Sequence, residues 1–113
     1  MSHESLNRLL LSFLEGREAM AVLIKPNGNV SVVKPANPEQ GFTLDELYKL
    51  VECETVQMVN LLGNKTMWID EEGKFREVHE VNEMATTMLH KAGGMPDDYI
   101  VGNALICDEG EVK

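Results

Sequence analysis

The sequence has few of the side chains from which metal sites are built. Its two cysteines, Cys53 and Cys107, lie far apart in the chain, and its three histidines, His3, His79 and His90, are scattered. A zinc site needs three or four such ligands that converge on one point, so we predict no metal site and no cofactor. Both cysteines lie in or beside apolar runs, and we expect two reduced, buried thiols.

Motifs for nucleophilic catalysis and for phosphate binding are also absent. Cys107 and His79 would be the thiol and base of a catalytic pair, but no local signature supports that pair, and apolar surroundings raise the pKa of a thiol. Gly93-Gly94 follows a predicted helix, so it offers carbonyl groups where phosphate binding requires N–H groups. We therefore name no catalytic residue and predict that the protein is not an enzyme.

Long apolar runs and targeting signals are missing as well. No segment approaches the ~18 to 20 apolar residues that span a bilayer, and the start, Met1-Ser2-His3-Glu4, lacks the basic region of a secretory signal. With 113 residues, of which 43% are hydrophobic and 26% charged, the chain has the composition of a globular protein. We expect a cytoplasmic protein that does not bind membranes.

Basic residues are outnumbered by acidic ones. The chain has 19 Asp and Glu against 10 Lys and Arg, which gives a net charge of −9, and residues 41–113 carry the whole excess. An acidic surface repels phosphate backbones, which argues against direct nucleic-acid binding, and it attracts basic partners. The alternative is that the acids serve only to keep the protein soluble.

The N-terminal residues have the periodicity of a helix. Apolar residues recur there at helical spacing: Leu6, Leu9, Leu10, Phe13 and Leu14. This pattern predicts a helix over residues 5–15, so that residues 1–19 form a helical extension and residues 20–113 a single domain. The apolar stripe has to be buried either on the domain or on a second copy, so a homo-oligomer through residues 5–15 is one of the two expected arrangements.

Within residues 20–113, turn and capping signals separate strands from helices. Pro26-Asn27-Gly28-Asn29 predicts a hairpin between strands at 21–24 and 30–33. Thr43 and Glu46 fit a capping box that begins one helix, and Asn82 fits the N-cap of another. Further strands are predicted at 55–62 and 66–69, and the most apolar run, 100–107, is expected at the centre of the sheet.

This mixture of hairpins and helices predicts the fold class. We expect an α+β fold: a small, mostly antiparallel sheet with the helices on one face, plus the extra N-terminal helix. Phe75, after the acidic turn at 70–74, is expected to begin a short return strand. Methionines are numerous, and Met58, Met67, Met84 and Met88 are predicted to fill the core.

Two acidic pairs are the leading candidates for a binding surface. Glu71 and Glu72 lie in one predicted turn, and Asp97 and Asp98 lie in a loop after Pro96. Our first hypothesis is a non-enzymatic interaction protein whose acidic half contacts a basic partner through these four residues. Charge complementarity of this kind sets association rate and selectivity more than affinity.

The alternative hypothesis is a module that sequesters a small anionic ligand such as a nucleotide. Lys25, Lys34, Lys65 and Arg76 lie at predicted strand ends and turns. If these turns lie together at one end of the sheet, the four cations form an anion site. We expect that site to lie at an oligomer interface. The simpler interpretation is that lysines at strand ends protect the sheet edges.

Several short motifs resemble a known family in their order and spacing. They are Met20-Ala21-Val22-Leu23-Ile24-Lys25-Pro26-Asn27-Gly28, Thr43-Leu44-Asp45-Glu46-Leu47, Asp70-Glu71-Glu72-Gly73-Lys74, Asn82 with Ala85, and Asp98-Tyr99-Ile100-Val101-Gly102-Asn103-Ala104-Leu105-Ile106. About residues 20–107 resemble a family of small proteins from bacteriophages and bacterial mobile elements, which is known only as a domain of unknown function.

The resemblance implies a biological setting and supplies no catalytic residues. It implies a phage or mobile-element product that acts inside a bacterial host cell, where small acidic proteins of that origin often act on host defence systems. A host protein is therefore the implied partner, although origin and fold do not determine function. Two segments depart from the pattern: the helix of residues 1–15 is extra, and Val51-Glu52-Cys53-Glu54 lacks the expected glycine-rich turn.

Overall fold

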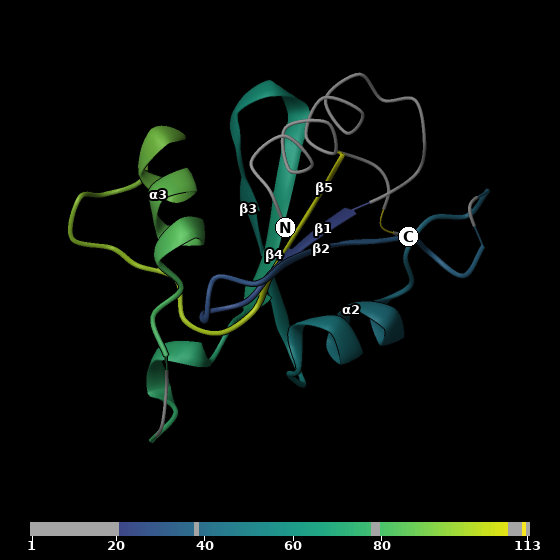
Figure 1. Ribbon diagram of the computed structural model, residues 1–113, viewed down its shortest axis with the longest axis horizontal. Coiled ribbons are helices and arrows are strands. Elements are labelled where there is room, and N and C mark those ends of the chain that lie inside the picture. Colours follow the sequence, from purple (N-terminus) through teal and green to yellow (C-terminus); the bar gives the residue numbers. More distant parts are fainter. Residues whose placement is uncertain (1–20, 38, 78–79, 109–111, 113) are drawn as a thin grey trace.

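The computed structural model describes residues 21–37, 39–77, 80–108 and 112, which form a sheet with helices packed on it (Figure 1). The elements are β1 (Ala21–Ile24), β2 (Val30–Val33), α2 (Leu44–Val51), β3 (Val56–Asn60), the 3₁₀ turn η1 (Leu62–Asn64), β4 (Lys65–Asp70), the 3₁₀ turn η2 (Gly73–Phe75), α3 (Glu83–Lys91) and β5 (Ala104–Asp108). None of the helices in this part of the chain has the length and apolar character of a membrane-spanning helix.

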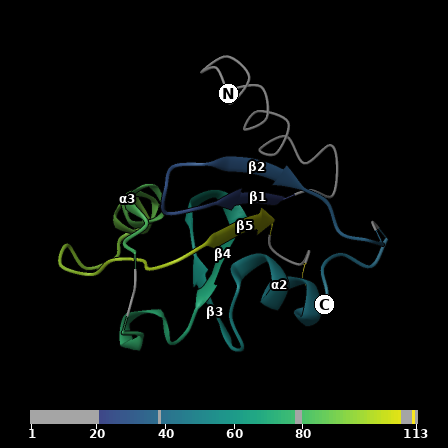
Figure 2. The same cartoon turned by 60° about the horizontal axis from the view of Figure 1, so that its bottom comes forward.

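The five strands form one sheet in the order β2-β1-β5-β4-β3, and every neighbouring pair is antiparallel (Figure 2). The predicted α+β class and antiparallel sheet are confirmed, and β5 lies at the centre, as its apolar sequence indicates. The first hairpin joins β1 and β2 at the predicted Asn-Gly turn. The helix predicted at 5–15 and the extension 1–19 lie outside the described residues.

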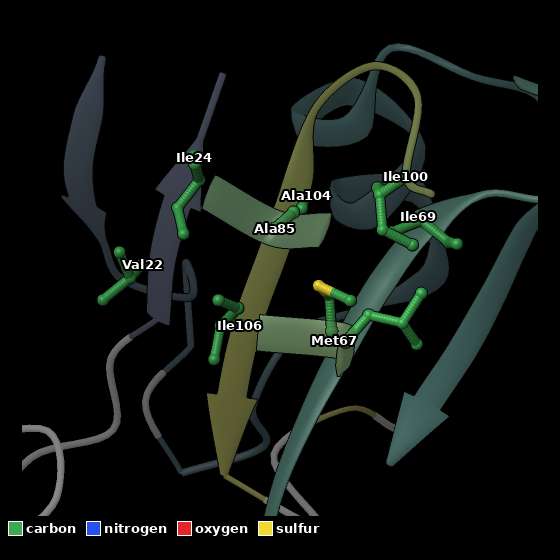
Figure 3. Close-up of a cluster of buried hydrophobic side chains, with 9 residues drawn as sticks. Val22, Ile24, Met67, Ile69, Ala85, Ile100, Ala104 and Ile106 are labelled. Carbon is green, nitrogen blue, oxygen red and sulfur yellow. The ribbon is translucent and has the colours of Figure 1, made fainter. Parts of the chain in front are cut away.

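The two helices cover opposite faces of the sheet, so the expectation that the helices share one face is wrong (Figures 1 and 2). The core on the α3 side contains Val22, Ile24, Met67, Ile69, Ala85, Leu89, Ile100, Ala104 and Ile106 (Figure 3). The core on the α2 side contains Ala21, Leu23, Phe42, Leu47, Val51, Leu105 and Cys107. Consecutive side chains of a strand point to opposite faces, and β1 and β5 are apolar at consecutive positions, so each face needs a cover.

Helix α2 begins at the predicted capping box. The hydroxyl of Thr43 accepts from the Glu46 N–H at 3.2 Å, and the Glu46 carboxylate accepts from the Thr43 N–H at 3.0 Å. The same carboxylate also accepts from the N–H of Ala36 at 3.0 Å, so it ties the preceding loop to the helix. The N–H groups of Ala36 and Thr43 lower the pKa of Glu46, because they stabilise the charged form.

Asn82, which is 1% exposed, links the start of α3 to the end of β1 and to the segment before β5. Its side-chain amide donates to the carbonyls of Ile24 at 3.0 Å and Gly102 at 2.9 Å. Its side-chain oxygen accepts from the Ala85 N–H at 3.1 Å, which confirms the predicted N-cap. Its own N–H donates to the carbonyl of Ile100 at 2.7 Å. Since an aspartate could supply the cap but not the two donors, this position needs asparagine.

The methionine predictions are confirmed only in part, and the prediction for Phe75 is wrong. Met67 is fully buried and Met88 packs against the core on the α3 side. Met58 and Met84 are 47% and 40% exposed, so their placement in the core is wrong. Phe75 ends the η2 turn instead of beginning a strand, and its side chain is 86% exposed.

Replacing Asn82 with aspartate should destabilise the protein by about 2–3 kcal/mol at neutral pH, because a buried carboxylate would face two carbonyl oxygens. The measurement is urea unfolding followed by circular dichroism. Asn27→Asp is the matched control: it adds the same charge near the same end of the sheet and keeps an exposed oxygen that accepts from the Asn29 N–H. An equal loss in both variants would contradict a specific role for the Asn82 amide.

Candidate functional site

The chain topology gathers acidic loops at one end of the sheet. This end, where β1 and β4 finish and β3 and β5 begin, consists of segments 25–29, 52–55, 70–77, 80–82 and 95–103, and we call it the acidic end. Its exposed acids are Glu52, Glu54, Glu71, Glu72, Glu77, Glu80 and Asp97. Among the described residues, no ion pair joins any of these seven acids to a base. The acidic end therefore presents unneutralised negative charge to solvent.

A cleft of about 320 Å³ opens at the acidic end. The β1–β2 turn, the last residues of α2, the η2 turn and the segment leading into β5 form its walls. Two cations, Lys25 and Arg76, and three carboxylates, Glu52, Asp70 and Glu80, line it. Because the acids outnumber the bases here, an anionic ligand would have to bind through Lys25 and Arg76 against the repulsion of the three carboxylates.

The η2 turn closes tightly on the segment that leads into β5. A Cβ atom at Gly73 would lie 3.2 Å from the carbonyl oxygen of Val101 and 3.3 Å from its Cβ. These contacts leave little room for any side chain at position 73. Asp70, Gly73 and Val101 line both the cleft and a smaller hollow of about 130 Å³ between α3 and the sheet.

Asp70 is the buried charged group of this wall, with 9% of its surface exposed. One of its oxygens accepts from the Arg76 Nε at 2.6 Å, and the other accepts from the Glu72 N–H at 3.0 Å. The hydrogen bond to Asp70 raises the pKa of the Arg76 guanidinium. The pair therefore stabilises the path of the turn at 71–75 and holds Arg76 at the cleft.

The structure brings the predicted acidic pairs close to each other. Lys74 forms an ion pair with Asp98, which connects the turn containing Glu71 and Glu72 to the loop containing Asp97 and Asp98. Glu71 and Asp98 both line the smaller hollow. Three of the four acids are exposed, whereas Asp98 is half-buried and its charge is balanced by Lys74.

Two interactions stabilise the charged form of Asp98. The hydrogen bond from the Lys74 ammonium, and then the bond from the Tyr99 N–H at 2.8 Å, hold the pKa of the Asp98 carboxyl below its usual range. The Lys74 ammonium also lies 4.7 Å from the centroid of the Tyr99 ring. The loop is thus fixed to the η2 turn by one lysine.

The four cations of the alternative hypothesis are not gathered at one place. Lys25 and Arg76 line the cleft at the acidic end. Lys34 follows β2 and Lys65 begins β4, which places both at the opposite end of the sheet. Lys65 is 7% exposed and forms an ion pair with Asp108. Only two of the four predicted residues therefore share a site.

Sequence reasoning missed the role of Asn103, which is 6% exposed. Its side-chain amide donates to the carbonyl of Leu50 at 3.0 Å and to the carboxylate of Glu52 at 2.7 Å. Glu52 adopts a left-handed conformation, with φ 61° and ψ 54°, that ends α2. The only sequence signal for Asn103 is a polar residue directly before a continuous apolar strand, and that signal does not identify its partners.

Metal-ligating residue types do not cluster in the described part of the chain. Among them, no set of three His, Cys, Asp or Glu residues comes together that could hold a metal ion. Cys107 is fully buried within β5, with its sulfur 3.6 Å from the hydroxyl of Thr66. Cys53 is partly buried, and burial raises the pKa of its thiol. Neither cysteine forms a disulfide, and the expected burial is confirmed for Cys107 but wrong for Cys53.

Replacing Lys74 with glutamine should raise the pKa of Asp98 toward the ordinary aspartate value of about 3.9, as measured by NMR titration of its carboxyl carbon. In the wild type, the stabilisation that this low pKa provides is present above that value and is lost as the pH falls through the folded-state pKa. The effect on stability should stay below about 1 kcal/mol, because the pair is exposed to solvent.

Lys25→Gln is the control for this titration. It removes the same charge from the acidic end without touching Asp98. If Lys25→Gln raised the pKa of Asp98 as much as Lys74→Gln did, the general field of the acidic end, and not the contact with Lys74, would govern the pKa.

Comparison with known proteins gives a family without a described activity. A family model described as "Domain of unknown function (DUF3846)" matches residues 19–112. No curated protein matches the chain, and no solved structure matches it. The matched range contains every strand and helix of the described fold as well as the whole acidic end. The chain therefore belongs to the DUF3846 family of domains of unknown function.

Proposed function

We propose that this protein is a non-enzymatic binding protein whose acidic end contacts a basic surface on another protein. The observation that carries the proposal is the distribution of charge at the acidic end. Glu71, Glu72 and Asp97 are exposed there without an ion-pair partner among the described residues. Unneutralised charges of one sign on neighbouring loops raise the association rate with a surface of the opposite sign.

An exposed aromatic side chain adds apolar contact area to this surface. Phe75 is 86% exposed on the η2 turn, directly after Lys74 and three residues from Glu72. Interfaces commonly combine an aromatic anchor with a charged rim, and the anchor contributes much of the affinity. Phe75 would supply that anchor, and the carboxylates around it would supply orientation and selectivity.

The cellular setting of the proposal comes from the resemblance to phage and mobile-element proteins. In that setting the protein acts in the bacterial cytoplasm, and its partner is a host protein that it blocks, with a defence factor as the expected class. The mechanism requires only that the acidic end covers a basic surface that the host protein needs for its own activity. No bond is made or broken.

Neutralising Glu71, Glu72 and Asp97 together, with Gln, Gln and Asn, should weaken partner binding about tenfold or more at low ionic strength, mainly through slower association. The partner is first captured from a bacterial lysate with the full chain, then purified and titrated against each variant by a kinetic binding assay. Wild-type affinity should fall steeply with salt, because screening shortens the range of surface charges to about 3 Å at 1 M.

The control variant carries Glu39→Gln and Asp45→Asn, which remove exposed acids away from the acidic end. It should bind the partner nearly as well as the wild type. An affinity that stays constant between low and high salt, or an equal loss in both variants, would rule out recognition through the acidic end. Phe75→Ser should increase the dissociation rate and leave the salt dependence intact.

A second candidate function is the binding of a small anionic nucleotide in the cleft, which Lys25 and Arg76 line together. It predicts that a nucleotide raises the melting temperature, because a ligand that binds the folded state stabilises it by mass action. Lys25→Gln should remove that rise, and Lys34→Gln, at the opposite end of the sheet, should not. A nucleotide panel that leaves the melting temperature unchanged at millimolar concentration would eliminate this function.

A further inference from the structure

The two edges of the sheet differ in how they are protected. Edge strands expose unpaired N–H and C=O groups, and proteins usually guard them with charged residues or proline. The edge strand β2 is followed directly by Lys34 and Pro35. The other edge strand, β3, has neither, since the chain contains no charged residue and no proline between Glu54 and Lys65. Edge β3 is therefore open to pairing.

The hydrogen bonds to β4 establish which backbone groups of β3 point outward. The Leu61 N–H donates to the carbonyl of Lys65 at 2.8 Å, and the Thr55 carbonyl accepts from Glu71 at 3.1 Å. Bonded residues alternate along an antiparallel pair, so the odd-numbered residues of β3 bond to β4. The N–H and C=O groups of its even-numbered residues, from Val56 to Asn60, point away from the sheet.

We propose that β3 pairs with β3 of a second copy of this chain, antiparallel and with a two-fold axis at Met58. In that register Met58 of one copy lies opposite Met58 of the other, and Val56 lies opposite Asn60. Each outward N–H then meets an outward C=O, because residues that direct their backbone groups outward face each other in this alignment. The two sheets become one continuous sheet.

The side chains fit this self-pairing. Met58 is on the α2 side, opposite Trp68 on β4, and 47% of its surface is exposed. Since directly opposite residues of an antiparallel pair share one face, the two Met58 side chains would pack on each other and cover that exposed surface. Gln57 and Val59 would face each other on the α3 side. No charge opposes a like charge at any position.

The distribution of charge also favours a second copy of the chain as the partner of edge β3. Two copies with a net charge of −9 each repel one another, so self-association needs a surface without carboxylates, and β3 is an exposed strand of this kind. The antiparallel arrangement places the acidic end of one copy beside the opposite end of the other, so the two acidic ends stay apart. A basic partner, in contrast, would be attracted to the acidic end.

Sedimentation of the full chain at increasing concentration tests the proposal. The mass should rise from 12.6 kDa toward twice that value, and added salt should favour the dimer, because salt screens the repulsion. Met58→Lys should weaken the dimer at least about tenfold, since like charges directly opposite each other destabilise a strand pair. Met95→Lys adds the same charge at a loop residue that is 68% exposed and should leave the dimer intact.

Amide hydrogen exchange supplies a readout that does not depend on the folding of a variant. Protection of the Met58 and Asn60 amides should grow with protein concentration, whereas the Val59 amide, which bonds to β4, should be protected throughout. A monomer at all concentrations, or a dimer that Met58→Lys leaves unchanged, would overturn the proposal. Salt strengthens this dimer but weakens partner binding at the acidic end, so failure of one proposal is distinguishable from failure of the other.

Discussion

Two buried asparagines hold the segment that leads into the central strand, and the shape of the acidic end depends on them. Asn82 connects this segment to the end of β1 and to the first turn of α3. Asn103 connects it to the end of α2. Each uses both protons of its side-chain amide: Asn82 donates to the carbonyls of Ile24 and Gly102, and Asn103 donates to the carbonyl of Leu50 and the carboxylate of Glu52. The loops of β1, α2 and α3 are thereby fixed around one cleft.

The order of strands and turns explains why negative charge is concentrated at this end of the sheet. In an antiparallel sheet, successive turns alternate between the two ends, so acidic turns that are distant in the chain can share one end. The turns after α2 and β4 and the loop before β5 all fall at the end that Asn82 and Asn103 organise. Of the acids there, Asp70 and Asp98 are paired with Arg76 and Lys74. These pairs fix the loops, and the remaining carboxylates are left to solvent.

Local signals in the sequence predicted the elements well, because their causes are local. The capping box of Thr43 and Glu46, the N-cap at Asn82 and the Asn-Gly turn each act within a few residues, and all three form as predicted. The central position of β5 followed from its continuous apolar run. That run also implied burial on both faces of the sheet, a consequence that contradicts the expectation of helices on one face.

The candidate site was predicted less completely, because it depends on contacts between distant segments. The exposure of Glu71, Glu72 and Asp97 could be predicted from turn signals. The pairing of Asp98 with Lys74 could not be predicted in this way. The grouping of Lys25 and Arg76 without Lys34 and Lys65 required the strand order, which the sequence did not provide. Asn103 was missed because nothing in its neighbourhood identifies Leu50 and Glu52 as its partners.

The two proposed surfaces are compatible, since they use different parts of the sheet. The acidic end lies across the strand ends, whereas edge β3 runs along the strand direction. In a dimer through β3 the acidic ends would point in opposite directions, so that each remains open to its own partner. Two linked sites raise the apparent affinity for a target that carries two basic surfaces, without any new contact. A small protein whose recognition relies on screened surface charge would gain most from this arrangement, because each single contact is weak.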